Sequence, residues 1–111
     1  MKHTTELDYH NGLKDLINRL GYFRNKRNLS AREVSLRLGY TESWYYRVEA
    51  GDININSTTL FALIDLLEIT PSELFYYDLT KYDEDKELLE LIRNMSKSEK
   101  EALCQIIKMK K

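Results

Sequence analysis

The chain has 111 residues, with 17 Lys and Arg against 18 Asp and Glu, and one cysteine, Cys104. This length suits a single domain whose core needs no disulfide or metal. The lone cysteine favours a reducing cytoplasm. Residues 1–10 hold no apolar run and the longest such run spans residues 60–64, so we expect neither a signal peptide nor a membrane-spanning helix.

The formal net charge of −1 is the sum of three unlike segments. Residues 1–51 carry nine basic and six acidic side chains, net +3; residues 52–95 carry three and ten, net −7; residues 96–111 carry five and two, net +3. The average therefore does not argue against a nucleic-acid partner, but it predicts modest binding by one copy.

The chain holds four Gly, one Pro and no strand pattern, and its apolar residues recur at helical spacing, which predicts an all-α fold. A first helix is expected over about residues 12–26, after a flexible N-terminus of residues 1–11. Its apolar positions are Leu13, Leu16, Ile17, Leu20 and Phe23.

Two short helices follow. Ser30 and Glu33 form a capping box that opens a helix over about residues 31–38, and Gly39 is placed for a positive φ. Thr41 is expected to cap a helix over about residues 42–50, which Gly51 ends; its inward pair is Tyr45 and Val48.

The remaining helices are predicted from capping residues and from the helical spacing of their apolar residues. Ser57 is expected to cap a fourth helix, and Thr70–Glu73 combines a cap, a proline and a capping-box glutamate to open a fifth through Phe75. After a connector over 76–82 come a sixth helix and, opened by Ser96–Glu99, a seventh.

The segment from Ser30 to Gly51 has the order of a helix-turn-helix. The runs LSAREVSLRLGYT (29–41), WYYRVEAG (44–51) and ITPSELF (69–75) resemble the phage repressor/Cro-like (Xre-type) family, over about residues 12–76. The resemblance implies a five-helix lambda-repressor-like DNA-binding domain, here over residues 12–78, followed by two helices in an extension over 83–109. Members dock their third helix in the DNA major groove, usually as dimers.

The resemblance places base reading at Glu42, Ser43 and Arg47, and helical spacing puts Tyr46 on the same face. Arg47 can donate two hydrogen bonds to guanine; the alternative is a solvated charge. Contacts to the DNA backbone are expected from Ser30, Arg32, Arg37, Thr41, Trp44, Ser57 and Thr58. For Trp44, packing on the first helix or the following loop is an equal alternative.

The resemblance also implies an ion pair between Arg24 and Glu49 that joins the first helix to the end of the third, and a fork of two hydrogen bonds would fix it best. Three features depart from the family. Ala31 stands where the family commonly has a glutamine that bonds a phosphate and braces the third helix. Glu42 is acidic where an amide is common, and residues 52–56 replace an often basic loop. Each departure weakens phosphate binding.

The apolar residues of the last two helices exceed what a free tail needs. They are Leu88, Leu91, Ile92, Met95, Leu103, Ile106 and Ile107. Dimerisation is the expected role, and the alternatives are folding back on the fifth helix or pairing within the chain. The acidic stretch before them is either a solvated helix face or a surface that limits nonspecific DNA binding or meets a protein.

No catalytic or metal-binding pattern is present: His3 and His10 have no ligand cluster beside them, and Cys104 is expected to be buried and inert. We therefore expect no enzyme, no metal and no cofactor. The sequence predicts a cytoplasmic, prokaryotic or phage-encoded transcriptional regulator, a repressor, that binds double-stranded DNA as a homodimer and not a membrane. The alternative is a helical module that binds a protein through Trp44, Tyr46 and the C-terminal helices.

Overall fold

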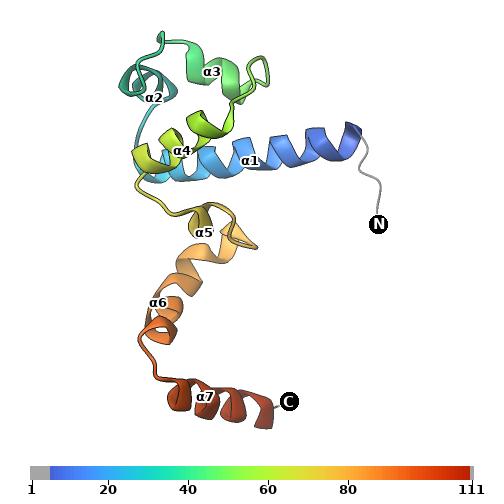
Figure 1. Ribbon diagram of the computed structural model, residues 1–111, viewed down its shortest axis with the longest axis vertical. Coiled ribbons are helices and arrows are strands. Elements are labelled where there is room, and N and C mark those ends of the chain that lie inside the picture. Colours follow the sequence, from blue (N-terminus) through green and yellow to red (C-terminus); the bar gives the residue numbers. More distant parts are fainter. Residues whose placement is uncertain (1–5, 111) are drawn as a thin grey trace. The chain divides into compact units, whose positions relative to one another are not determined.

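The computed structural model describes residues 6–110, and side chains from Asn11 to Lys110. Within these residues the fold is all-α, as predicted, and no strand is present. The elements are α1 (Glu6–Lys26), α2 (Ala31–Arg37), α3 (Trp44–Glu49), α4 (Ser57–Leu66), α5 (Pro71–Leu74), the short 3₁₀ helix η1 (Leu79–Lys81), α6 (Tyr82–Arg93) and α7 (Lys97–Met109) (Figure 1). Contacts divide the chain into an N-terminal unit ending at Tyr76 and a C-terminal unit from Tyr77 onward.

The first helix starts earlier than predicted, at Glu6 and not near Gly12. Nothing in residues 6–12 forces a break, because the segment has no proline and one glycine inside a helix costs only about 1 kcal/mol. Residues 6–11, expected to be flexible, therefore belong to the helix, and the rest of that expected segment, residues 1–5, lies outside the described residues.

All three predicted capping boxes are confirmed, at Ser30/Glu33, Thr70/Glu73 and Ser96/Glu99. In the first, the Ser30 Oγ accepts from the Glu33 amide at 3.0 Å and the Ser30 amide donates to Glu33 Oε1 at 3.2 Å. The hydrogen bonds from Ser30 hold the pKa of the Glu33 carboxyl below its usual range, and those from Ser96 do the same for Glu99.

Two predicted caps are wrong. Thr41 does not open α3, because its carbonyl accepts from the Trp44 amide at 3.0 Å. Glu42 and Ser43 therefore belong to the turn before α3, and Ser43 is the N-cap. Ser57 does not cap α4, because Asn56 already accepts from the Thr59 amide at 2.8 Å. Asparagine is at least as good an N-cap as serine.

Four helices end in one repeated way. Asn28, Gly39, Gly51 and Glu68 follow α1, α2, α3 and α4 with φ of 55°, 83°, 85° and 55°. In each case the next amide reaches back to the last turn, as in Asp52 N to Arg47 O at 2.9 Å. Glycine and, after it, asparagine are the residues that favour this conformation, whereas Glu68 adopts it against the preference of a residue with a Cβ.

The core of the N-terminal unit lies where α1 packs against α3 and α5 and α2 packs against α3. Its buried apolar residues are Leu20, Phe23, Leu29, Val34, Tyr45, Val48, Leu63, Ile64, Leu67 and Leu74. Leu13, predicted on the apolar face of α1, is 46% exposed, since the N-terminal part of α1 extends past the other helices of the unit (Figure 1).

Arg19 ties α1 to the end of α5. Its Nη1 donates to the carbonyl of Leu74 at 3.0 Å and to that of Tyr76, while its Nε bonds Asp15 at 2.8 Å. These carbonyls are the unpaired acceptors of a helix end, so a guanidinium is a suitable partner for them. Nothing in the sequence pattern singles out this contact.

The C-terminal unit is built differently. Asp78 caps η1 by accepting from the Thr80 amide at 3.0 Å. Among the helices of this unit only Tyr82, the first residue of α6, is buried, and α7 contains no buried residue. None of the helices between residues 6 and 110 combines the length and hydropathy needed to span a bilayer.

One buried hydrogen bond joins the two helices of the helix-turn-helix. Ser35 is fully buried; its Oγ donates to the Ala31 carbonyl at 2.9 Å and accepts from the Tyr45 amide at 2.8 Å. That amide is in the first turn of α3 and has no partner inside the helix. Tyr45 is also fully buried, and this burial raises the pKa of its hydroxyl well above the usual range.

We expect Ser35→Ala to lower the free energy of unfolding by about 1–3 kcal/mol, because the buried Tyr45 amide loses its acceptor. Urea denaturation followed by circular dichroism measures the change. Ser72→Ala, at an exposed position of α5, is the matched control, with an expected change within about 0.5 kcal/mol. Equal midpoints for the two variants would contradict the role assigned to Ser35.

Candidate nucleic-acid interface

The turn before α3 and the outward side of α3 form one exposed surface, which we call the recognition face: Glu42, Ser43, Tyr46 and Arg47. Tyr45 and Val48 point into the core, at 0% and 1% exposure, so the residues between them are turned outward. The Arg47 amide donates to the Ser43 carbonyl at 3.1 Å, which places these two residues one turn apart on the same side. Tyr46 is 68% exposed beside them.

Glu42 does not stand alone on this face. Its Oε2 accepts from Arg32 Nε at 2.8 Å, and both side chains are about two-thirds exposed. The hydrogen bond and the charge of Glu42 raise the pKa of Arg32 above its usual range. The pair bridges the first turn of α2 and the turn before α3. Glu42, expected to read bases, is therefore the ion-pair partner of Arg32, expected to bind phosphate.

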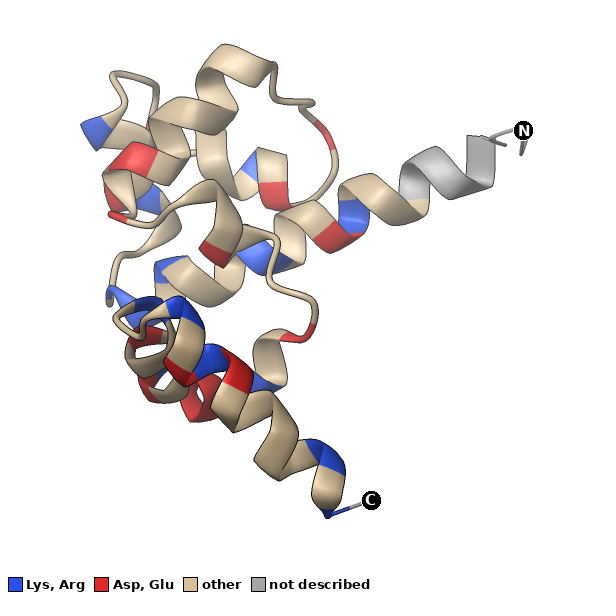
Figure 2. Ribbon diagram, turned by 60° about the horizontal axis from the view of Figure 1, so that its bottom comes forward, with Lys and Arg blue, Asp and Glu red and all other residues tan. Residues whose placement is uncertain are grey.

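Most arginines of the N-terminal unit are neutralised by carboxylates. Besides Arg32–Glu42, ion pairs join Arg19 to Asp15, Arg24 to Glu49 and Arg27 to Glu68. Among the residues with described side chains in this unit, Arg37 and Arg47 are the arginines without an ion pair. Figure 2 shows the same mixture, with Lys and Arg beside Asp and Glu along the chain.

Trp44 stacks on Tyr40, with ring centroids 4.0 Å apart and planes 10° from parallel. Tyr40 lies in the turn after α2, is 42% exposed and was not among the predicted site residues. The contact joins the two ends of the turn, and no helical or strand spacing would reveal it. Trp44 itself is half-buried at the start of α3.

The other residues expected to contact the DNA backbone are exposed and lie at helix ends or in turns. Ser30 precedes α2 and its hydroxyl serves as the cap, whereas Thr41 lies in the turn before α3. Ser57 and Thr58 open α4, where backbone amides of the first turn have no partner inside the helix. Arg37 is the last residue of α2.

Arg24 and Glu49 are joined as the resemblance implies, though not by a fork. Arg24 Nη2 lies 3.3 Å from Glu49 Oε2, while Nη1 donates to the Leu29 carbonyl at 2.8 Å. The side chains are 17% and 25% exposed, and the buried Nε has no partner among the described residues. One guanidinium thus holds the end of α1, the loop after it and the end of α3 together.

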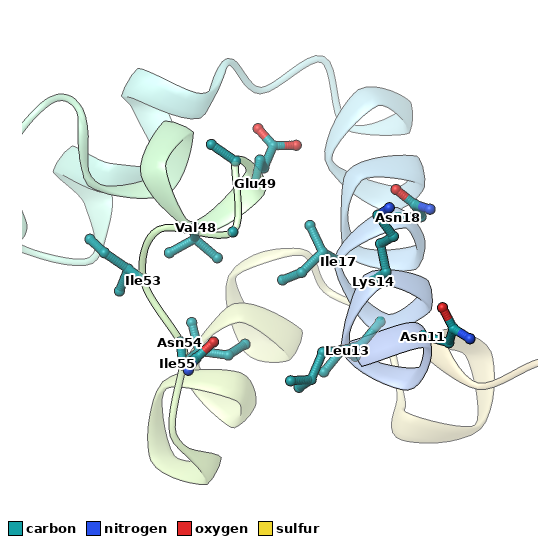
Figure 3. Close-up of a pocket in the computed structure, with 13 residues that line it drawn as sticks. Asn11, Leu13, Lys14, Ile17, Asn18, Val48, Glu49, Ile53, Asn54 and Ile55 are labelled. Carbon is teal, nitrogen blue, oxygen red and sulfur yellow. The ribbon is translucent and has the colours of Figure 1, made fainter. Parts of the chain in front are cut away.

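A cavity of about 590 Å³ opens between α1 and the segment that follows α3. Figure 3 shows Leu13 and Ile17 of α1 facing Val48, Ile53 and Ile55 across it. Glu49 is the one carboxylate of its lining, and it is already paired with Arg24. The lining brings no histidine, cysteine or pair of carboxylates together.

Residues with described side chains form no cluster of His, Cys, Asp and Glu that could hold a metal ion. His3 and His10, for which no ligand cluster was expected, lie outside those residues. The expectation that Cys104 is buried is wrong, because its side chain is exposed on α7. Ile106 and Ile107 of the same helix are exposed as well, at 54% and 50%.

Residues 20–74 match the model of the helix-turn-helix family, in agreement with the Xre/Cro/C1-like resemblance. The match runs from the buried half of α1 to the end of α5 and so covers the core, the recognition face and the Arg24–Glu49 pair. Comparisons with curated proteins and with solved structures gave no match. Residues 20–74 belong to this family, and the N-terminal unit carries the helix-turn-helix of a DNA-binding regulator.

Arg24→Ala is expected to lower the free energy of unfolding by about 1–3 kcal/mol, because Glu49 and the Leu29 carbonyl both lose their partner in a half-buried place. Each kcal/mol corresponds to a drop in Tm of roughly 4–8 °C for a domain of this size. Arg27→Ala, which breaks the more exposed pair with Glu68, should cost less. An unchanged Tm for Arg24→Ala would show that the pair does not hold α1 to α3.

Proposed function

We propose that this protein is a sequence-specific transcriptional repressor that inserts α3 into the major groove of double-stranded DNA and acts as a homodimer. The observation that carries the proposal is Arg47: an arginine without an ion pair, on the exposed side of a helix that is fixed to α2 by the Ser35–Tyr45 hydrogen bond and to α1 by Arg24. A rigid helix that presents a free guanidinium suits the recognition of guanine, whose O6 and N7 accept two hydrogen bonds from it.

The other members of the recognition face supply the remaining base contacts. Ser43 can donate to or accept from a base edge, and Tyr46 offers a large surface to a thymine methyl group. Glu42 accepts from cytosine N4 once it releases Arg32, and it disfavours sequences that present an acceptor at that place.

Contacts to the sugar-phosphate backbone come from neutral groups as much as from charges. Of the two arginines expected to bind phosphate, Arg37 has no ion pair, and Arg32 loses its own when Glu42 turns to a base. The amides and hydroxyls at Ser30, Thr41, Ser57 and Thr58, with the Trp44–Tyr40 stack, complete the set. With few charged contacts, the affinity of one copy is modest and depends weakly on salt.

A dimer compensates for this modest affinity, because two linked half-sites bind more tightly than one. We assign self-association to the extension over residues 83–109 and to its exposed or half-buried apolar residues Leu88, Leu91, Ile92, Met95, Leu103, Ile106 and Ile107. Residues 12–78 then act as the DNA-binding domain.

Selection from a random duplex library at two salt concentrations tests the proposal. We expect enrichment of a palindrome whose half-sites are about one helical turn apart. If nothing is enriched at the lower salt concentration, the protein does not read DNA sequence, and the exposed Tyr46 beside the half-buried Trp44 points to a protein partner in place of DNA.

Arg47→Ala should weaken binding to the selected site by about 1–3 kcal/mol and relax the preference at one base position. Arg37→Ala, which removes a phosphate contact, should weaken binding to all sequences alike and reduce the salt slope by about 0.9. Titrations of each variant against matched and mismatched duplexes compare the two. A uniform loss for Arg47→Ala would make Arg47 a phosphate contact.

Glu42→Gln should increase affinity for nonspecific duplex and steepen the salt slope by about 0.9, because Arg32 no longer has a carboxylate partner and turns to a phosphate. Glu68→Gln changes the net charge by the same amount and frees Arg27, which lies outside the recognition face. An equal gain for the two variants would mean that net charge, and not the release of Arg32, controls the affinity.

A further inference from the structure

The C-terminal unit has two amphipathic helices and almost no core. Leu88 and Leu91 of α6 are 54% and 60% exposed, and Ile106 and Ile107 of α7 are 54% and 50% exposed. Helices of 12 and 13 residues are marginal in water by themselves, so most of their stability must come from burying an apolar face. The described residues of the unit cover these faces only in part, since Ile92, Met95 and Leu103 are half-buried and the other stripe residues are exposed.

Each apolar face is a continuous stripe. On α6 it follows the spacing of one helix side, with Leu88, Leu91, Ile92 and Met95 three, four or seven residues apart. On α7 the corresponding residues are Leu103, Ile106 and Ile107. Two stripes of similar length per chain are enough to build a four-helix arrangement from two copies.

The two helices carry opposite charge. Helix α6 holds five carboxylates against two basic residues, net −3, whereas α7 holds three lysines against two glutamates, net +1, with Lys110 directly after it. The charges are placed beside the stripes. Glu84 and Glu87 lie two turns and one turn before Leu91 on the same side of α6, and Lys97 and Lys100 lie together along one side of α7, with Lys100 one turn before Leu103.

We infer that α6 of one copy packs against α7 of a second copy, and α7 against the second copy's α6, so that each apolar stripe is covered by a helix of the opposite charge. A two-fold axis makes the two contacts identical, as an isologous dimer requires. Pairing α6 with α6 would oppose two helices of net −3, and pairing α7 with α7 would oppose two lysine-bearing sides. Only the mixed pairing brings unlike charges together at both contacts.

This inference rests on the dimer proposed above and names the surfaces that form it. Its test is sedimentation equilibrium of the full chain, which needs no DNA. We compare wild type, an α6 variant (Glu84→Lys with Glu87→Lys), an α7 variant (Lys97→Glu with Lys100→Glu) and a chain with all four changes. Glu90→Lys, on the side of α6 opposite the stripe, is the control for a charge change alone.

The wild type and the Glu90→Lys control should be dimers. The α6 variant and the α7 variant should each dissociate with a Kd at least about tenfold higher, since both contacts of the dimer then oppose like charges. A mixture of these two variants should form a heterodimer, and the chain with all four changes should regain the homodimer. Circular dichroism and the Tm of each variant check that the helices still form.

Three results would overturn the mixed pairing. A monomeric wild type would mean that another part of the same chain covers the stripes. An unchanged dimer in both the α6 variant and the α7 variant would favour pairing of α6 with α6 and of α7 with α7. Failure of the chain with all four changes to dimerise would mean that the charges of α6 and α7 do not face each other. The library selection remains separate: a dimer that enriches no DNA sequence contradicts the proposed function only, and a DNA-binding monomer contradicts the pairing only.

Discussion

The hydrogen bond from the Tyr45 amide to the Ser35 hydroxyl is the constraint on which the geometry of the helix-turn-helix depends. It lies at the centre of the contact between α2 and α3, where both residues are fully buried. A six-residue helix cannot be stable by propensity, so its orientation has to come from such tertiary contacts. Because Tyr45 and Val48 are held inward, Tyr46 and Arg47 have to face outward.

The electrostatics of the domain follow from the same packing. Folding brings a carboxylate to Arg19, Arg24, Arg27 and Arg32, and this leaves few cations for phosphate. Under the proposed function, a domain built in this way gains little from nonspecific attraction to DNA and relies on the fit of its recognition face and on backbone amides. The number of arginines that remain unpaired in the fold therefore says more about attraction to phosphate than the net charge of the chain does.

The C-terminal unit presents the opposite situation, since its helices are well formed locally while most apolar residues of their stripes stay exposed among the described residues of the unit. The capping box at Ser96 and Glu99 explains why α7 begins where it does, but a cap contributes only about 1 kcal/mol and does not bury an apolar stripe. In the pairing proposed above, the opposite charges on α6 and α7 favour contact between these stripes in two copies, and the proposed dimer would in turn span two half-sites.

The sequence by itself determined what depends on neighbouring residues: the all-α class, three capping boxes, the glycines at the ends of α2 and α3, the inward pair Tyr45 and Val48, and the helix-turn-helix family. The tertiary structure alone decided the start of α3 at Trp44, the Ser35 bond, the partners of Arg19 and Arg32, and the exposure of Cys104. Caps and periodicity act within about four residues and can be read locally. The Tyr45 amide, Glu42 and the Tyr76 carbonyl are 10, 10 and 57 residues from their partners Ser35, Arg32 and Arg19, so only the packing of whole helices brings these groups together.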